Sequence, residues 1–193
     1  VVIERSTITS NELRYVDINE LIGGGGIANV MSYVGIHASI VAGNEHEDLG
    51  LHEYAPDCAD FGVFVGDEAF GWLSDAGEFA SDSYNLVGSL EGCDSFDPAT
   101  EDIVPIDDAP IDPELGPLTP WTAGGTELHI PSAQSPARRA GPRCTIPPIH
   151  GTPVPDCFDV DQRGYLRGSV GMDTDIGAYE GDGTAPPPSP RGG

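Results

Sequence analysis

Apolar residues in this chain recur in short, β-branched runs that alternate with polar residues. Such alternation, with a period of two, predicts strands that bury one face. Four consecutive glycines at 23–26 and the polar residues 45–57 predict loops, and 66–82, with Trp72 among acidic residues, predicts a short helix or an excursion. The predicted strands lie at 1–11, 12–22, 27–44, 61–65 and 83–88.

Two stretches of the predicted strands repeat one another 33 residues apart (position 3 against position 36). Residues 3–11 read Ile-Glu-Arg-Ser-Thr-Ile-Thr-Ser-Asn, and residues 36–44 read Ile-His-Ala-Ser-Ile-Val-Ala-Gly-Asn, with Ile, Ser and Asn at the same places. A repeat of short strands that ends in Asn is typical of a coiled β solenoid, in which each turn stacks on the last. Asn tolerates the left-handed conformation of a tight turn and can hydrogen-bond to its copy in the next turn. The alternative is a chance similarity of two strands.

The charge of the chain excludes several classes of protein. There are 32 Asp and Glu against 8 basic residues, all of them Arg, and the formal net charge is −24. Binding to nucleic acid or to an anionic lipid surface needs cations that this chain lacks, so neither partner is predicted. Membrane insertion is not predicted either, because there is no run of about 18 apolar residues. The acidic surface is expected to be solvated, with specific Ca²⁺ sites as the alternative.

The cysteine pattern favours disulfides over a zinc site. No two cysteines form a CxxC pair, which a zinc ribbon would need. An even number of cysteines in an acidic chain without Lys, rich in Gly and Pro, fits an oxidising compartment. The pairs that close the shorter loops are Cys58–Cys93 and Cys144–Cys157. Reduced, buried thiols are the alternative.

Acidic motifs near the C-terminus are the candidates for a metal site or for catalysis. The stretch 159–164 begins like an EF-hand loop, but Arg163 at the fifth position and Val170 at the twelfth do not fit one. Asp161 and Arg163 could form a catalytic pair, yet a structural role is the stronger interpretation, because Arg forks onto carboxylates and carbonyls and fixes loops. Asp175 and Glu180 are the expected partners in that network. His46 and His52 match no standard metal site.

Several motifs stand in the order in which they occur near the C-terminus of one protein family. They are 23–29, 39–44 with 56–58, 84–88 with 92–93, 112–118, and the closing pair 161–164 and 175–180. In these motifs the chain resembles the choice-of-anchor Q proteins, which are secreted or surface bacterial proteins built on a right-handed parallel β-helix. The closing pair, with its spacing, is the most specific part of the resemblance.

The chain departs from the pattern of that family at two positions. Thr174 stands where the family has a Cys, so Cys157 is left to pair with Cys144 or to stay unpaired. Arg139 stands where the family has an Asp, which changes any polar contact made there.

The resemblance implies an all-β fold, a right-handed parallel β-helix (solenoid) with an irregular, loop-rich C-terminal cap. The rungs would span 1–104 and the cap 105–181, followed by a Pro/Gly-rich tail at 182–193. It also implies a non-enzymatic structural protein, extracellular or on the cell surface. Because Val1 begins inside a predicted strand, the first rung is expected to be open. It would pair with preceding sequence or with another chain, as in a homo-oligomer or a filament.

Two other functions stay open at this stage. One is a fragment of a β-helix enzyme that acts on polysaccharides, such as a lyase, which would need three or more carboxylates beside an Arg on one rung face. The other is an adhesin that binds a glycan, in which aromatic rings would stack on sugars. The candidate rings are those of Tyr54, Trp72, Tyr84 and Trp121. The net charge of −24 disfavours polyanionic substrates in the absence of Ca²⁺.

Overall fold

The structure, a computed structural model, describes ten stretches of the chain. They are residues 1–14, 25–30, 32–47, 57–61, 78–93, 95–107, 109–121, 126–143, 160–167 and 171–181. Within them the fold is all-β, with short strands in mostly parallel pairs and one 3₁₀ turn at Pro98–Thr100. No helix in these stretches is long and apolar enough to cross a membrane. The chain divides into two compact units, Val1–Pro113 and Glu114–Gly193.

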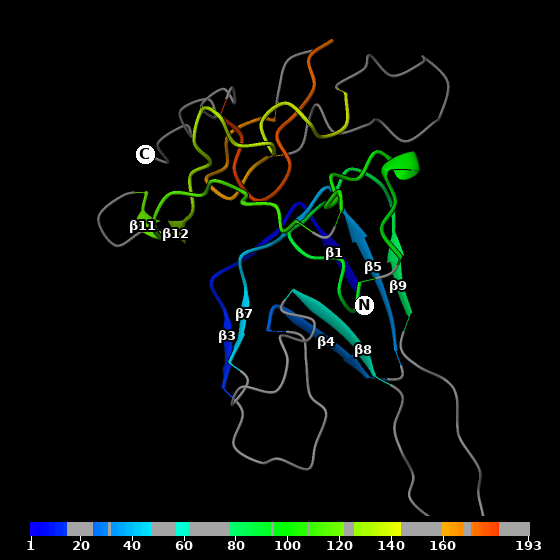
Figure 1. Cartoon of the computed structure of the whole chain (residues 1–193). Helices are drawn as coiled ribbons and strands as arrows, with labels where there is room; N and C mark the ends of the chain where they lie inside the picture. The colour runs from blue at the N-terminus through cyan, green and yellow to red at the C-terminus, as the bar shows by residue number, and fades with distance from the viewer. Residues whose placement is uncertain are drawn as a thin grey trace, which may run out of the picture. The chain divides into compact units, whose positions relative to one another are not determined.

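The strands of the first unit form three successive layers. They are β1 (Val2–Glu4), β2 (Thr7–Ile8), β3 (Glu12–Arg14) and β4 (Ile27–Val30), then β5 (Tyr33–His37), β6 (Ile40–Val41), β7 (Glu45–Glu47) and β8 (Cys58–Phe61), and then β9 (Glu78–Ser81) and β10 (Leu86–Val87). Strands of successive layers pair in parallel, as Figure 1 shows for β1, β5 and β9, for β3 and β7, and for β4 and β8. The sheets are therefore β1-β5-β9, β2-β6-β10, β3-β7 and β4-β8.

The register of these pairs confirms the repeat read from the sequence. Ile3 lies beside Ile36 in the β1–β5 pair, and Glu12 lies beside Glu45 in the β3–β7 pair. Both pairs have the same offset of 33 residues, so like residues stand over like in columns. The two similar stretches therefore occupy equivalent positions in adjacent layers, which excludes a chance similarity.

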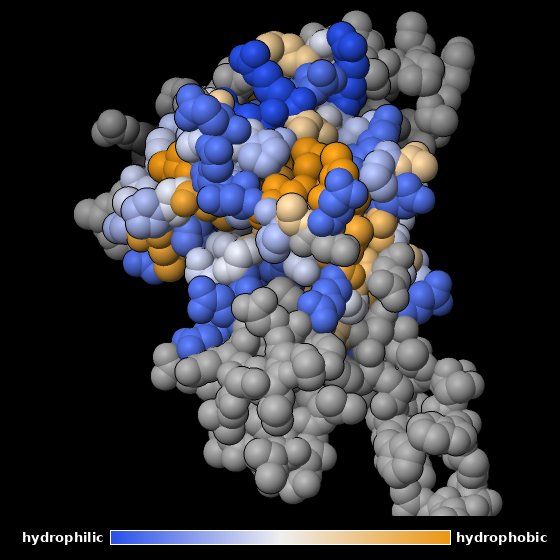
Figure 2. All heavy atoms as spheres, viewed as in Figure 1, coloured by the Kyte–Doolittle hydropathy of each residue, from blue (hydrophilic) through white to orange (hydrophobic). Residues whose placement is uncertain are grey.

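The core of the first unit lies between the inward faces of these sheets. Val34, Ile36 and Phe79 are buried there, whereas Tyr33 and Glu78 on the same strands are exposed. Burial of one such apolar side chain contributes about 1.5–3 kcal/mol. On the face seen in Figure 2, hydrophilic residues cover much of the described surface, and apolar residues show only in restricted areas. The buried cluster comprises Val34, Ile36, Val41, Cys58, Phe79, Val87, Cys93, Phe96 and Val104.

The corners between strands use left-handed residues, but these are not the asparagines that we expected to take that conformation. Ser10 and Gly43, with φ of 57° and 70°, stand one place before Asn11 and Asn44. Arg5 and Ala38, with φ of 44° and 47°, occupy the same place at the preceding corner. The left-handed residue turns the chain, and the next residue then directs its side chain along the stack. The columns at these corners are therefore polar.

Two strands of the first unit were not predicted. β7 lies within 45–57, which we expected to be a loop, and β9 lies within 66–82, where we expected a helix or an excursion. The polar β7 is a strand because its backbone pairs with β3, and β9 is one because it pairs with β5 and buries Phe79. Of the predicted strand 61–65, only Phe61 lies within the described residues, as the last residue of β8.

The described part of the second unit is built mainly of turns and irregular segments. Its strands within the described residues are β11 (Thr119–Pro120) and β12 (Glu127–Leu128), which pair antiparallel. Isolated antiparallel bridges join Leu115 to Pro131, Arg143 to Asp173 and Val160 to Leu166. Cys144, Cys157 and the predicted tail at 182–193 lie outside the described residues.

Candidate functional site

A column of polar side chains runs along the first corner of the stack. The N–H of Ser6 donates to Ser39 Oγ at 3.1 Å, and the N–H of Ser39 donates to Asn85 Oδ1 at 3.1 Å. The N–H of Asn85 donates to Asp102 Oδ1 at 2.8 Å, and Asp102 also accepts from Ser81 Oγ at 2.6 Å. An ionised carboxylate has acceptors and no donor. The column therefore ends at Asp102.

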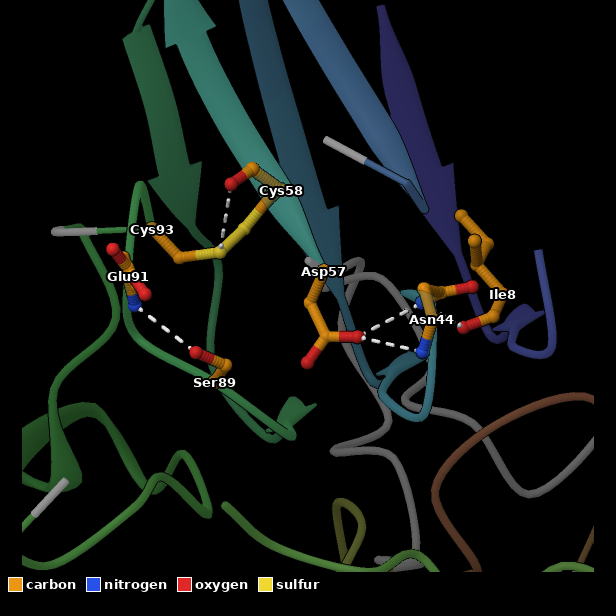
Figure 3. Close-up of a disulfide and its surroundings, with 7 residues drawn as sticks. All are labelled: Ile8, Asn44, Asp57, Cys58, Ser89, Glu91 and Cys93. Atoms are coloured by element: carbon orange, nitrogen blue, oxygen red, sulfur yellow. Dashed lines mark hydrogen bonds between the residues drawn. A yellow bond between two sulfur atoms is a disulfide. The ribbon is translucent and has the colours of Figure 1, made fainter. Parts of the chain in front are cut away.

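A second column, formed by amides, runs along the next corner. The backbone N–H and the Nδ2 of Asn11 both donate to Asn44 Oδ1, at 3.2 and 2.9 Å. The same two groups of Asn44 donate to Asp57 Oδ1 at 3.1 and 2.9 Å (Figure 3). Asn44 Nδ2 also reaches the carbonyl of Ile8 at 3.1 Å. An amide both accepts and donates and so continues the column, whereas Asp57 only accepts and ends it.

Burial of Asp57 raises the pKa of its carboxyl group above the ordinary value of 3.8. The hydrogen bonds from the side chain and backbone of Asn44, and from the backbone of Ser89, act in the opposite direction and offset only part of this effect. Only 2 % of Asp57 is exposed. The folded chain therefore binds a proton at this position more tightly than the unfolded chain does.

We expect the contribution of Asp57 to stability to fall as the pH rises. Between the unfolded pKa of 3.8 and the raised folded pKa, the folded state holds the extra proton, so stability is lost as the pH increases through that window. The measurement is thermal unfolding of the chain and of an Asp57→Asn variant across about pH 4 to 7. As the pH rises, the stability of the unaltered chain should fall relative to that of the variant. Asp107→Asn, at an exposed position whose φ of 55° suits Asn, is the control. A difference between chain and variant that does not depend on pH would contradict the expectation.

The structure contains the predicted disulfide between Cys58 and Cys93. The two Cα atoms lie 5.5 Å apart, and the bond spans a sequence separation of 35 residues. Both cysteines are fully buried. A cross-link over such a loop stabilises the fold by about 4 kcal/mol in the chain-entropy picture.

Asp161 and Arg163, predicted as network residues, form a buried ion pair in the second unit. Arg163 donates from Nε and Nη2 to Asp161 Oδ2, at 2.7 and 2.5 Å. The side chain of Arg163 is 4 % exposed and that of Asp161 is fully buried. Asp161 Oδ1 accepts the backbone N–H groups of Arg163 and Tyr165, at 2.8 and 3.0 Å, which fixes the turn between them. Arg163 Nη2 also donates to the carbonyl of Glu180 at 2.6 Å, which links this turn to the last described residues.

Asp175 and Glu180, the other two predicted residues, belong to the same network. Glu180 Oε2 accepts the N–H of Asp175 at 2.9 Å, and the N–H of Glu180 reaches Asp161 Oδ2 at 3.2 Å. Arg138 forms an ion pair with Asp175, with Nε 3.0 Å from Oδ2, and Asp175 Oδ1 accepts the N–H of Arg139 at 2.8 Å. A polar contact is thus made at position 139, through the backbone of Arg139. Both acidic side chains are almost completely buried.

Two features of this network are not predicted from the sequence. Three aromatic rings surround the guanidinium of Arg163, with centroids 4.6 Å away for Trp121, 4.3 Å for Tyr165 and 3.9 Å for Tyr179. The ring of Trp121, which the sequence suggests as a platform for sugars, instead contacts Arg163. Arg167 is 2 % exposed and donates to backbone carbonyls of the loop 175–177. The signal in the sequence is the presence of Tyr165 and Arg167 directly after the first closing motif.

The chemistry of the network is that of an internal brace. Its carboxylates and guanidinium groups are paired with one another and with backbone groups of neighbouring turns, and burial strengthens such pairs while it hides them from solvent. Within the described stretches, no three His, Cys, Asp or Glu side chains are placed to hold a metal ion. His46 lies in β7, while His52, Asp159 and Val170 lie outside these stretches.

No protein-family model, no curated protein and no solved structure matches this chain. The resemblance to the choice-of-anchor Q proteins therefore stays a prediction that rests on the motifs in the sequence.

Proposed function

We propose that this chain is a non-enzymatic structural protein, extracellular or on the cell surface. Its first unit would form the last rungs of a right-handed parallel β-helix, and residues 105–181 would cap it. The chain would associate with itself through the open edge of its first layer. The disulfide between buried Cys58 and Cys93 supports an oxidising location.

The observation that carries the proposal is the stacking of successive layers in register. β1, β5 and β9 are parallel, and so are β2, β6 and β10, with the polar columns of both corners running along the same stack. Repetition of one coil with like residues superposed is the principle of solenoid proteins. Such stacks provide rigid, extended bodies.

The placement of the charged side chains supports a structural role over catalysis. Asp161 and Arg163, the pair with the best claim to catalysis, are buried and bonded to one another. Exposed carboxylates on the outer face of the β1-β5-β9 sheet are divided among its strands, with Glu4 on β1 and Glu78 on β9. A lyase would require such groups to converge beside a base.

Strand β1 is the edge through which association is proposed. The carbonyl of Val1 and the N–H of Arg5 hydrogen-bond to β5. Because alternate residues of a strand present their backbone groups to opposite sides, the N–H and carbonyl of Val2 point away from β5, toward the open edge. Val1 and Val2 are 77 % and 68 % exposed, whereas Leu86 in the last layer is fully buried and pairs with Ile103. Residues 1–14 carry two acidic and two basic side chains, so this edge has no excess of negative charge although the chain carries −24. Copies would therefore meet with least repulsion at this edge.

Sedimentation of the chain Val1–Gly193 over a range of concentrations tests the proposal. We expect association that strengthens with concentration and is lost in a Val2→Lys variant, because a lysine on an edge strand disfavours pairing with another strand. Ile106→Lys, at a side chain 79 % exposed, is the control and should associate like the unaltered chain. A chain that stays monomeric at about 100 μM would contradict self-association. The same runs with Ca²⁺ and with a chelator test the alternative of specific Ca²⁺ sites.

A further inference from the structure

Residues 88–93 close one side of the first unit, where the third layer has no strand among the described residues. The sheets β1-β5-β9 and β2-β6-β10 have three strands each, while β3-β7 and β4-β8 have two. After β10, the N–H of Gly88 donates to the carbonyl of Val41 at 2.9 Å, which attaches the start of the segment to β6. The N–H of Cys93 donates to the carbonyl of Leu90 at 2.9 Å and closes a turn at its end. The disulfide to Cys58 then holds the end of the segment at the first residue of β8.

This segment also covers the end of the amide column. A β-carbon on Gly88 would lie 2.6 Å from Asp57 Oδ2 and 2.9 Å from the β-carbon of Ala42, so the backbone of Gly88 packs directly on both. The backbone of Ser89 lies close enough to the carboxylate of Asp57 to lower its pKa. Next to Asp57 in the sequence, Cys58 is joined to Cys93 (Figure 3). One short segment therefore holds the carboxylate and the disulfide together.

We infer that residues 88–93 are a clasp on the stack, which the Cys58–Cys93 bond locks and which reduction of that bond opens. A dithiol such as dithiothreitol supplies the two electrons and two protons. The S–S bond breaks, two thiols form, and dithiothreitol becomes its cyclic disulfide. The opened clasp releases Gly88 and Ser89 from Asp57, while the three-stranded sheets keep their pairing. This inference concerns the chain itself and does not depend on the proposed structural function.

Burial of the disulfide makes its rate of reduction a measure of how firmly the clasp is held while the bond is intact. Neither cysteine is exposed, so a reductant reaches the sulfur atoms only when the structure around them loosens transiently. The rate of reduction under native conditions therefore reports how often the locked clasp loosens. It is measured in a Cys144→Ser/Cys157→Ser background, so that the Cys58–Cys93 bond is the one observed.

Two glycines provide a matched pair of variants for this measurement. Gly88→Ala places a β-carbon against Asp57 and Ala42, whereas a β-carbon on Gly35, also in the first unit, makes an ordinary contact of 3.5 Å with the ring of Tyr33. We expect Gly88→Ala to speed reduction by dithiothreitol about tenfold or more, because overpacking at that contact loosens the locked clasp around the disulfide. Gly35→Ala should leave the rate unchanged. Equal rates in the two variants would overturn the inference.

Hydrogen exchange of the chain without substitutions at the clasp gives an independent measurement if Gly88→Ala fails to fold. After reduction, the amides of Cys93 and Asn44 should exchange at least about tenfold faster, because their acceptors lie in the clasp or against it. The amides of Arg5 and Asp82, which bond within the β1-β5-β9 sheet, should keep their rates. Acceleration of all four amides alike, or of none, would show that the segment is not a local clasp.

Discussion

Replacement of Arg163 by alanine should lower the free energy of unfolding of the second unit by about 3–5 kcal/mol. The substitution leaves the fully buried carboxylate of Asp161 without its counter-charge. It also removes the bond to the carbonyl of Glu180 and the contacts with three aromatic rings. Denaturant unfolding followed by the fluorescence of Trp121, in a Trp72→Phe background, measures the change.

The controls for this prediction separate burial and geometry from charge. Arg143 and Asp173 form an exposed pair at 4.0 Å, with side chains 64 % and 50 % exposed, so Arg143→Ala should cost less than about 0.5 kcal/mol. Arg163→Lys keeps the charge but not the fork onto Asp161, and its effect should lie between the two. If Arg163→Ala is no more destabilising than Arg143→Ala, the network does not brace the second unit.

Replacement of Asn44 by alanine should destabilise the first unit by about 2–4 kcal/mol. Asn44 is 5 % exposed and stands in the middle of the amide column. Its loss removes the acceptor of Asn11, the side-chain donor to Asp57 and the donor to the carbonyl of Ile8. The buried carboxylate of Asp57 then keeps fewer of the hydrogen bonds that compensate its desolvation. Thermal or denaturant unfolding followed by far-ultraviolet circular dichroism measures the loss.

The position of a residue in the column sets the size of the effect. Asn11, at the start of the column, is exposed, so Asn11→Ala should cost less than about 1 kcal/mol. Asn44→Asp places a second carboxylate against Asp57 and should be more harmful at neutral than at acidic pH, because like charges at close range repel. If Asn11→Ala and Asn44→Ala lower the free energy of unfolding equally, the column stabilises the first unit no more than two separate side chains would.

The stacking of the first two layers could be predicted because the residues of one layer repeat in the next. Ile, Ser and Asn recur at an offset of 33 residues, and the structure pairs Ile3 with Ile36 and Asn11 with Asn44. The left-handed positions were harder to place, since Ser10 and Gly43 share only a backbone conformation. β9 was missed because its neighbourhood in the sequence is acidic and aromatic, and pairing with β5 decides its conformation.

Some of the residues that form the charged network of the second unit could also be predicted from the sequence. Asp161, Arg163, Asp175 and Glu180 belong to two motifs of the closing segment, and all four meet in one network. The rings around Arg163 come from separate places in the second unit, so no local spacing marks Trp121 as a neighbour of that residue.

By itself, the sequence determined the repeat, the β character, the Cys58–Cys93 pair and the residues of the closing network. These follow from local alternation, from copies of one motif and from short chemical signatures, all of which are visible along one dimension. Tertiary structure alone decided where the columns end and what covers them. Asp57 and Asp102 have no counterparts in the repeated stretches, and folding brings each against the last asparagine of its column. The backbone of Gly88 and Ser89 then covers Asp57. These residues are far from Asp57 in the sequence, so only tertiary packing brings them together.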